Sequence, residues 1–360
     1  MALMGSVREN VPLASLTTLR LGGPARRLVA PDREEALVDA VREIDSKGGR
    51  LLLLGGGSNL VVADEGFDGT VIHIETRGID LAQATGGDDR VHVTAAAGES
   101  WDLFVARCVA EGLSGVECLA GIPGRVGAVP MQNVGAYGQD VSDTIVRVRT
   151  WDRAARRVTD FDREACRFSY RNSTFRGREG HVILAVTFAL AKSASSKPIR
   201  YAELARALGV REGEPAPLAK VSDTVIALRR GKGMVLDASD PDTTSAGSFF
   251  TNPVVDAPGL ARVQERATKV LGAGESMPIF PERDGQSKLS AGWLIERSGF
   301  AKGYAAGPVA ISSKHALALT NRGNATTRDL LALARSIRQG VDAKFGVLLE
   351  NEPVFVGISL

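Results

Sequence analysis

The segment Gly121–Gly138 is the stretch that most constrains how this chain can fold. It reads GIPGRVGAVPMQNVGAYG and holds five glycines within 18 residues. Glycine lets the backbone come within hydrogen-bond reach of a ligand, and successive exposed N–H groups form an anion-binding nest. Pro123 and Pro130 stiffen the path, while Gln132 and Asn133 add amide donors. Because a long exposed loop of this kind is costly to order without a ligand, we favour a cradle for a diphosphate and a ring over a plain loop.

Length and composition indicate a globular protein of several domains. At about 150 residues per domain, the 360 residues divide into two or three domains. An apolar share of 44% is ordinary for a globular protein and excludes a disordered one. No stretch approaches the roughly 18 consecutive apolar residues of a membrane helix, and the N-terminal segment MALMGSVREN lacks the features of a secretion signal. We therefore expect a soluble cytoplasmic protein.

Charge and ligand spacing exclude further classes of protein. The 44 basic and 42 acidic residues give a net charge of +2, without the concentrated basic face of a nucleic-acid binder. The three cysteines lack CxxC spacing and the four histidines lack HxxxH spacing, so neither a disulfide framework nor a metal site is expected. The one dense basic patch, Arg229–Lys232, can be a solvated turn or a local anion site.

Hydrophobic periodicity predicts a chain of mixed strands and helices. Strand patterns occur at 18–24, 50–54, 70–74, 91–94, 146–149, 182–190, 346–349 and 354–358. Helix patterns begin at about Glu34, where Asp32 and Glu35 have capping-box spacing, and at Trp101. Helix, strand or loop signals follow at 201–208, 221–228, 260–271, 291–297 and 316–320, and periodicity predicts a long helix at 328–341. The run Lys192–Pro198 breaks the composition and is a candidate boundary or mobile link.

A second glycine-rich turn, Gly55–Asn59, follows the predicted strand at 50–54. It fails the GxGxxG fingerprint because Leu60 stands where a third glycine is needed, and it lacks the Gly-Lys-Ser/Thr of a P-loop. Read alone, such a turn is more often structural than ligand-binding. A Rossmann-type NAD dehydrogenase is therefore disfavoured.

Five motifs in order resemble one known family. They are LGGGSN, GIPGRVGAVPMQNVGAYG, the turn Tyr170–Ser173, AGSFFTNP at 246–253, and Glu352 near the C-terminus. Together they are similar to the UDP-N-acetylenolpyruvoylglucosamine reductases, flavoenzymes of peptidoglycan precursor synthesis. The resemblance runs from about Thr17 to Gly357 and so covers nearly the whole chain.

The resemblance implies an α+β fold in three parts. A two-lobed FAD-binding region of the vanillyl-alcohol-oxidase (PCMH) type precedes a separate α+β substrate-binding domain. We expect the first lobe at 1–75, with the C-terminal strands packing back on it, the second lobe at 76–220, and the substrate-binding domain at 221–360. The resemblance leaves the oligomeric state open, and a monomer is the expectation.

The family's reaction implies noncovalent FAD, NADPH as co-substrate and UDP-N-acetyl-enolpyruvoylglucosamine as substrate. NADPH reduces FAD, and the substrate then takes a hydride from flavin N5 at C3 and a proton at C2. The charge that develops at C2 needs stabilisation and an acid. By the resemblance, Ser248 is the proton donor, Glu352 lies near the developing enol, and Arg171 stabilises it.

The resemblance also implies two sets of contacts. The cofactor-binding residues are Gly55, Gly56, Gly57, Ser58, Asn59, Gly121, Ile122, Gly124, Gly127, Gln132, Asn133, Gly135, Tyr137 and Ile183. The substrate-binding residues are Tyr201, Arg229, Lys232, Asn252 and Lys288. Better-known members carry a lysine nearer the catalytic serine than Lys232 is, so the diphosphate-binding cation stays open.

Each of these residues has an ordinary alternative. Ser248 can be a turn serine, Glu352 a solvated charge with Glu350 as its competitor, and Arg171 a surface arginine. Tyr201 can be a core anchor of the helix that follows it. Two other functions also remain open: an FAD-linked oxidase or dehydrogenase of the same fold acting on an alcohol, and a non-catalytic flavin- or nucleotide-sugar-binding protein.

Overall fold

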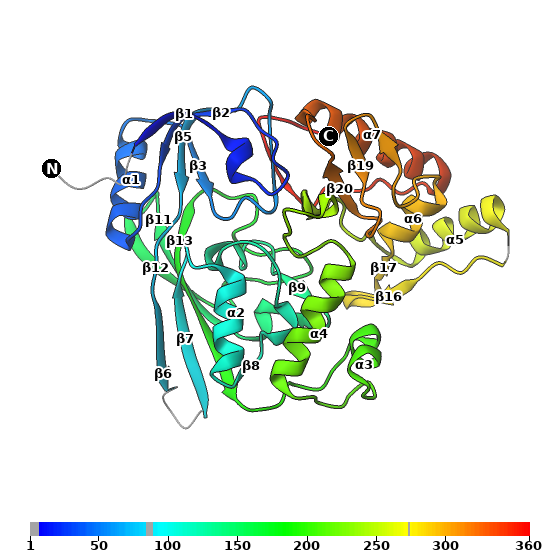
Figure 1. Ribbon diagram of the computed structural model, residues 1–360, viewed down its shortest axis with the longest axis horizontal. Helices are drawn as coiled ribbons and strands as arrows, with labels where there is room; N and C mark the ends of the chain where they lie inside the picture. The colour runs from blue at the N-terminus through cyan, green and yellow to red at the C-terminus, as the bar shows by residue number, and fades with distance from the viewer. Residues whose placement is uncertain (1–6, 84–88, 273) are drawn as a thin grey trace. The chain divides into compact units, whose positions relative to one another are not determined.

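A computed structural model describes residues 7–83, 89–272 and 274–360, which fold into two compact units (Figure 1). The first unit contains the described residues up to Val11, together with Ala25–Gly56 and Phe67–Val235. The second contains Pro12–Pro24, Gly57–Gly66 and Leu236–Leu360. Each unit has its own hydrophobic core.

A small sheet opens the first unit. Its strand order is β1 (Arg8–Pro12), β2 (Pro24–Val29), β5 (Phe67–His73) and β3 (Leu51–Leu54), and the last three strands are parallel. Helix α1 (Glu34–Ser46) provides the crossover that parallel strands require. It buries the apolar stripe that the sequence predicts, which is Leu37, Ala40, Val41 and Ile44.

A larger antiparallel sheet forms the rest of the first unit with three helices. Its order is β12-β11-β13-β7-β6, with β8 also paired to β13. The strands are β6 (Ile79–Gln83), β7 (Arg90–Ala96), β8 (Leu113–Ser114), β11 (Ile145–Asp152), β12 (Arg157–Asp162) and β13 (His181–Lys192). Helices α2 (Trp101–Ala110) and α4 (Leu218–Gly231) lie side by side, and α3 (Ala202–Leu208) packs on α4 (Figure 1). Two short strands, β9 (Gly135–Ala136) and β10 (Gln139–Asp140), close the long glycine-rich loop.

The second unit combines three small sheets with three helices. One sheet has the order β14 (Ser245–Ser248), β20 (Ala318–Asn321), β19 (Val309–Ile311) and β18 (Ala305–Ala306). Another has the order β15 (Val254–Val255), β17 (Ser287–Leu289) and β16 (Ile279–Pro281), and β21 (Val354–Val356) pairs in parallel with β4 (Leu60–Val62). The helices are α5 (Ala257–Leu271), α6 (Ala291–Arg297) and α7 (Thr327–Phe345).

Several sequence expectations about secondary structure are confirmed and three are wrong. The hairpin β11–β12 turns after Asp152 as expected, and α2 and α7 lie where periodicity predicts helices. Residues 18–24 form a turn in place of a strand, because Arg20 has φ 52° and Gly22 has φ 117°. Helix α1 begins after Arg33 without a side-chain cap, so the expected capping box is absent. Residues 346–349 form no strand, since Gly346 at φ 68° ends α7.

The unit boundaries also differ from the sequence expectation. The run Lys192–Pro198 lies inside the first unit, where Ser196 N–H donates to the Ala216 carbonyl at 2.9 Å. The second unit resumes at Leu236 and not at residue 221, because α4 packs with α2 and α3. Residues 12–24 and 57–66 group with the C-terminal part, where β21 pairs with β4.

Candidate functional site

The two glycine-rich turns of the first unit meet face to face. A Cβ on Gly56 would lie 2.8 Å from the Cα of Gly124, and a Cβ on Gly55 would lie 3.4 Å from the Cγ of Arg125. Such a 2.8 Å contact to backbone leaves no room for a side chain at Gly56. The sequence placed both turns in one cofactor site, and the structure brings Gly55 and Gly56 against the long loop.

The long loop is anchored to the α2 region by its own backbone. Gly124 O accepts from Trp101 N–H at 3.1 Å, and Gly127 N–H donates to Ala97 O at 2.8 Å. The Gly121 N–H donates to Asp102 Oδ1 at 2.7 Å. The amides of Gly121 and Gly127 therefore bond inside the protein, so these two glycines serve close packing and not, as expected, donation to a diphosphate.

The turn at 169–173 is joined to the second half of the loop. Asn133 Nδ2 donates to Ser169 O at 3.1 Å, and its Oδ1 accepts from Ser142 N–H at 3.1 Å. Ser173 Oγ donates to Met131 O at 2.8 Å. Both ends of the buried Asn133 amide thus hold the loop in shape. This internal use makes Asn133 a structural residue of the cradle.

Arg171 contacts the loop directly. Its Nη2 donates to the carbonyl of Gly135 at 2.9 Å, across 36 residues of sequence. Arg171 itself adopts a left-handed φ of 50°, and a Cβ on Gly135 would collide with Asp140 Oδ1. The backbone of the glycine-rich loop therefore fixes one edge of the guanidinium of Arg171.

Four side chains gather where the loop ends. Lys232 Nζ lies 5.4 Å from the centroid of the Tyr137 ring, and Tyr201 packs edge-on against the same ring at a centroid distance of 5.3 Å. Lys232 Nζ also bonds Glu203 Oε2 at 2.6 Å. Burial raises the pKa of the Tyr137 hydroxyl, against the opposing pull of Lys232 and Arg229. Tyr201 is 42% exposed, so the core-anchor alternative for this residue is wrong.

Arg229 lies beside this group under Gly121. Its Nη2 donates to Met234 O at 2.9 Å, whereas its buried Nε has no hydrogen-bond partner among the described residues. Burial lowers the pKa of Arg229 to about 10, so the guanidinium stays charged at neutral pH. A buried cation with an unsatisfied donor is the kind of group that an anionic ligand stabilises.

In the second unit, a backbone hydrogen bond joins the segment that carries Ser248 to the segment that carries Glu352. Ser248 ends β14 and Phe249 follows it, and the Phe249 carbonyl accepts from Glu352 N–H at 2.9 Å. Asn59 Nδ2 donates to the Glu352 carbonyl at 3.4 Å, and Val354 N–H donates to Asn59 O at 2.9 Å. Ser248 and Glu352 are both half-buried. The pairing favours Glu352 over Glu350 as the neighbour of Ser248.

The remaining predicted contacts are distributed across both units. Asn252 Oδ1 accepts from Ala291 N–H at 2.9 Å, and Lys288 Nζ pairs with Glu282 at 3.2 Å. Ile183 is buried in β13 within the core of the first unit. Among the other predicted cofactor contacts, Gly57, Ser58 and Asn59 belong to the second unit. Ile122 and Gln132 are half-buried residues of the long loop.

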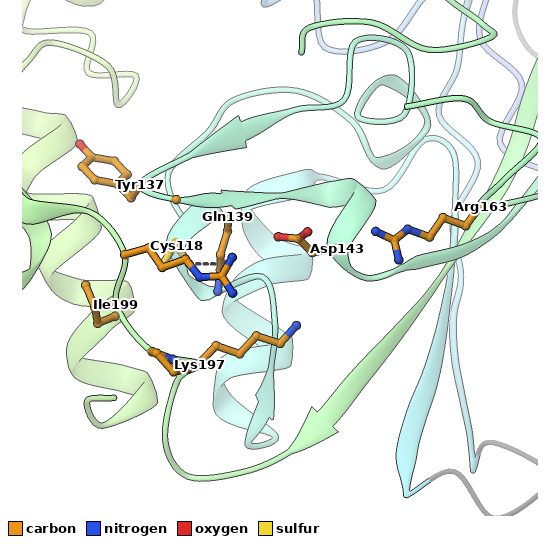
Figure 2. A pocket seen from close by; sticks show the side chains of 10 residues that line it. Cys118, Tyr137, Gln139, Asp143, Arg163, Lys197 and Ile199 are labelled. Atoms are coloured by element: carbon orange, nitrogen blue, oxygen red, sulfur yellow. Dashed lines mark hydrogen bonds between the residues drawn. The ribbon is translucent and has the colours of Figure 1, made fainter. Parts of the chain in front are cut away.

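Figure 2 shows a hollow of about 220 Å³ in the first unit, beyond Tyr137. Asp143, Arg163 and Lys197 point into it, whereas the Tyr137 ring points away from them (Figure 2). Its lining is Cys118, Tyr137, Gly138, Gln139, Asp143, Arg163, Lys197, Pro198, Ile199 and Arg200. Tyr137 lines this hollow and also contacts Tyr201 and Lys232 of the predicted site.

The sequence reasoning missed two acidic residues of the site. Asp102 anchors Gly121, and Glu203 pairs with Lys232 across 29 residues. Glu203 stands two positions after Tyr201, but nothing local in the sequence indicates its partner. Only the packing of α3 on α4 brings the pair together.

Residues 7–83, 89–272 and 274–360 contain neither a membrane-spanning helix nor a metal-binding cluster of side chains. No helix there is both long and apolar enough to span a membrane. In the same residues, no group of three or more His, Cys, Asp or Glu side chains is arranged to hold a metal ion.

Two family models match the chain, one in its N-terminal half and the other near its C-terminus. The model described as UDP-N-acetylenolpyruvoylglucosamine reductase, C-terminal domain, matches residues 240–356. The model described as FAD binding domain matches residues 25–160.

Curated proteins and a solved structure show the same similarity along nearly the full length. The UDP-N-acetylenolpyruvoylglucosamine reductase of Thermobifida fusca is 58% identical over 99% of both chains. That of Streptomyces coelicolor is 54% identical over 98% of this chain and 91% of its own. The crystal structure of the reductase from Thermus caldophilus covers 98% of this chain and 100% of its own, with a TM-score of 0.64 and 26% identity.

Proposed function

The chain belongs to the UDP-N-acetylenolpyruvoylglucosamine reductase family, and we propose that Ser248, Glu352 and Arg171 carry out the chemistry of that reductase. The activity is the FAD-dependent reduction of UDP-N-acetylenolpyruvoylglucosamine to UDP-N-acetylmuramate, in peptidoglycan precursor synthesis. The α+β fold, with its FAD-binding region and separate C-terminal domain, is that of the family. NADPH is the co-substrate consistent with this activity.

The first unit fits a flavin dinucleotide. The close approach of Gly56 to Gly124 leaves no room for a side chain at Gly56, so the two glycine-rich turns meet backbone to backbone. We assign the holding of FAD to Gly55, Gly56 and the loop Gly121–Gly138, without a covalent tether, since these segments contain neither histidine nor cysteine. Bound FAD supplies a carrier for the hydride that passes from NADPH to C3 of the substrate.

The chemistry left to the protein is to stabilise and quench negative charge at C2. Hydride addition to C3 of an enol ether leaves enolate character at C2, conjugated with the substrate carboxylate. Ser248 Oγ donates a proton to C2, a transfer that is downhill because a carbanion is a much stronger base than an alkoxide. Glu352, whose N–H donates to the carbonyl of the residue after Ser248, is assigned to the developing enol. Arg171, fixed by its bond to Gly135, presents its guanidinium to the carboxylate oxygens.

The basic group at the end of the loop is assigned to the nucleotide diphosphate. Lys232 and Arg229 supply positive charge, and Arg229 Nε is a buried donor without a partner in the described chain. Tyr201 is exposed beside Tyr137, where its hydroxyl can reach a phosphate oxygen. Asn252 and Lys288 are proposed as further contacts to the nucleotide sugar.

The observation that supports this mechanism is the hydrogen bond from Glu352 N–H to Phe249 O, because it joins the segment of the proposed acid to the residue that follows the proposed proton donor. The test uses the purified protein, whose yellow colour should be released on denaturation. After photoreduction of the flavin without oxygen, UDP-N-acetylenolpyruvoylglucosamine should restore the oxidised spectrum and yield UDP-N-acetylmuramate. An alcohol oxidase of the same fold would instead be reduced by its alcohol, and a non-catalytic binder would bind the nucleotide sugar without reoxidation.

The setting of the reaction is also proposed. The protein acts in the cytoplasm as a monomer and serves cell-wall biogenesis, cell shape and cell division. The first unit is proposed to bind FAD and to supply Arg171, Tyr201, Arg229 and Lys232 to the substrate, and the second is proposed to supply Ser248, Glu352, Asn252 and Lys288. Light scattering of the purified holoenzyme tests the monomer, and a dimer mass would contradict it.

A further inference from the structure

The ammonium of Lys232 is bound by a carboxylate of the protein itself. Lys232 follows the last turn of α4, and Glu203 lies in the first turn of α3. Lys232 Nζ lies 2.6 Å from Glu203 Oε2, and the two side chains are 32% and 39% exposed. A charged pair at this distance and exposure forms readily but is also open to exchange with dissolved ions.

The same ammonium lies near the aromatic pair of Tyr137 and Tyr201. It lies 5.4 Å from the centroid of Tyr137, whose ring Tyr201 meets edge-on. Tyr201 and Glu203 belong to one short segment, since Tyr201 is the N-cap of α3. The start of α3 therefore contacts Lys232 by charge and Tyr137 by ring contact at once.

The charges around this point favour an anion. Arg229 interacts electrostatically with Tyr137 and Asp102, and its buried Nε lacks a partner in the described chain. Asp102 is already bonded to Gly121 N–H. Glu203 is thus the carboxylate that holds Lys232, and a phosphate arriving at the same ammonium meets a like charge.

We propose that Glu203 is an affinity-setting residue of the nucleotide-sugar site, an internal carboxylate that the diphosphate of the ligand displaces from Lys232. The inference rests on the proposed role of Lys232 in binding that diphosphate. The ligand class is a nucleoside diphosphate, and the cost of displacement selects against ligands with a single weak anionic group.

The test is titration of UDP into the oxidised holoenzyme by calorimetry at low salt. Glu203→Gln should tighten UDP binding by roughly two- to fivefold, the range expected for removal of a partly exposed ion pair. Lys232→Gln should weaken UDP binding, and adding Glu203→Gln to it should then change nothing further. High salt should shrink the Glu203→Gln effect, because salt screens partly exposed charges.

Asp223→Asn is the matched control, because this exposed carboxylate of α4 also loses its charge but has no described ion pair. It should bind UDP like the wild type. If Glu203→Gln weakens UDP or leaves it unchanged while Lys232→Gln still weakens it, the displacement proposal is overturned and the binding role of Lys232 stands. If Lys232→Gln binds UDP like the wild type, the assignment of Lys232 fails and this inference fails with it.

Discussion

The carboxylate of Glu117 accepts a 2.9 Å hydrogen bond from the side-chain amide of Gln139, and both residues are buried. Glu117 also accepts from Gly115 N–H at 2.6 Å, and Gln139 Oε1 accepts from Cys118 N–H at 2.9 Å. This network fixes the backbone that follows Tyr137, and two of its members, Cys118 and Gln139, line the hollow in Figure 2.

Glu117→Ala should therefore destabilise the protein by roughly 2–4 kcal/mol, because it leaves three buried donors, on Ser114, Gly115 and Gln139, without their acceptor. Denaturant titration of the variant and the wild type measures the difference. Glu164→Ala, at an exposed carboxylate outside the network, should lie within about 0.5 kcal/mol of the wild type. A loss below about 1 kcal/mol for Glu117→Ala would show that water replaces the network.

Gly56→Ala should yield folded protein that has lost most of its flavin. The new Cβ would lie 2.8 Å from the Cα of Gly124, so the two turns of the cradle must separate. The ratio of flavin absorbance to protein absorbance in the purified variant measures the loss. Gly180→Ala is the control, since that glycine has open space around it and no positive φ. A fully flavinated Gly56→Ala protein would contradict the cradle assignment.

Ser248→Ala should separate the two half-reactions. Flavin reduction by NADPH needs no proton from the protein and should stay fast, whereas reoxidation by the enolpyruvyl substrate should slow by about 10²- to 10⁴-fold. Ser248→Cys keeps a proton donor of similar shape and should retain more of the second step. Stopped-flow absorbance of the flavin follows each step separately. Equal slowing of both steps would make Ser248 a structural turn residue.

His73 should make stability depend on pH. Burial lowers the pKa of His73, and the charges of Arg125 and Arg8 lower it further against the attraction of Glu75. Below about pH 6.5 the unfolded chain then binds a proton that the folded protein resists, so stability is full above that pH and falls as pH drops. The slope should reach at most about 1.4 kcal/mol per pH unit in denaturant titrations. His73→Gln should remove this slope and His92→Gln should keep it; an unchanged slope in His73→Gln would assign the effect elsewhere.

The cysteines should resist alkylation in the native protein. Burial raises the pKa of the Cys108 and Cys166 thiols to about 12, and burial also raises that of Cys118. Since the thiolate is the nucleophile, iodoacetamide at pH 8 should label none of them until denaturant is added, when three thiols should react. Mass spectrometry counts the labels. Rapid native labelling of Cys118, which lines the hollow in Figure 2, would show that this hollow opens to reagents.

Much of this architecture could be predicted because it depends on near neighbours in the chain. The stripe of α1 and the turn after Asp152 follow from spacings of a few residues, which the helix and hairpin periods alone define. The short spacing of the glycines in 121–138 likewise predicts that another group approaches this backbone closely. Where a local signal was weak, as at residues 18–24, tertiary contacts overrode it and a turn formed.

The sequence by itself determined the family, the order of the motifs and the residue types that the chemistry requires. Only the packing of the elements decided which residues meet: Gly56 with Gly124, Arg171 with Gly135, and Glu352 with Phe249, the residue after Ser248. It also decided that Glu203 binds Lys232, a pair that no motif contains. The physical reason is that a contact between distant residues depends on how whole elements pack, and local periodicity encodes the elements but not their partners.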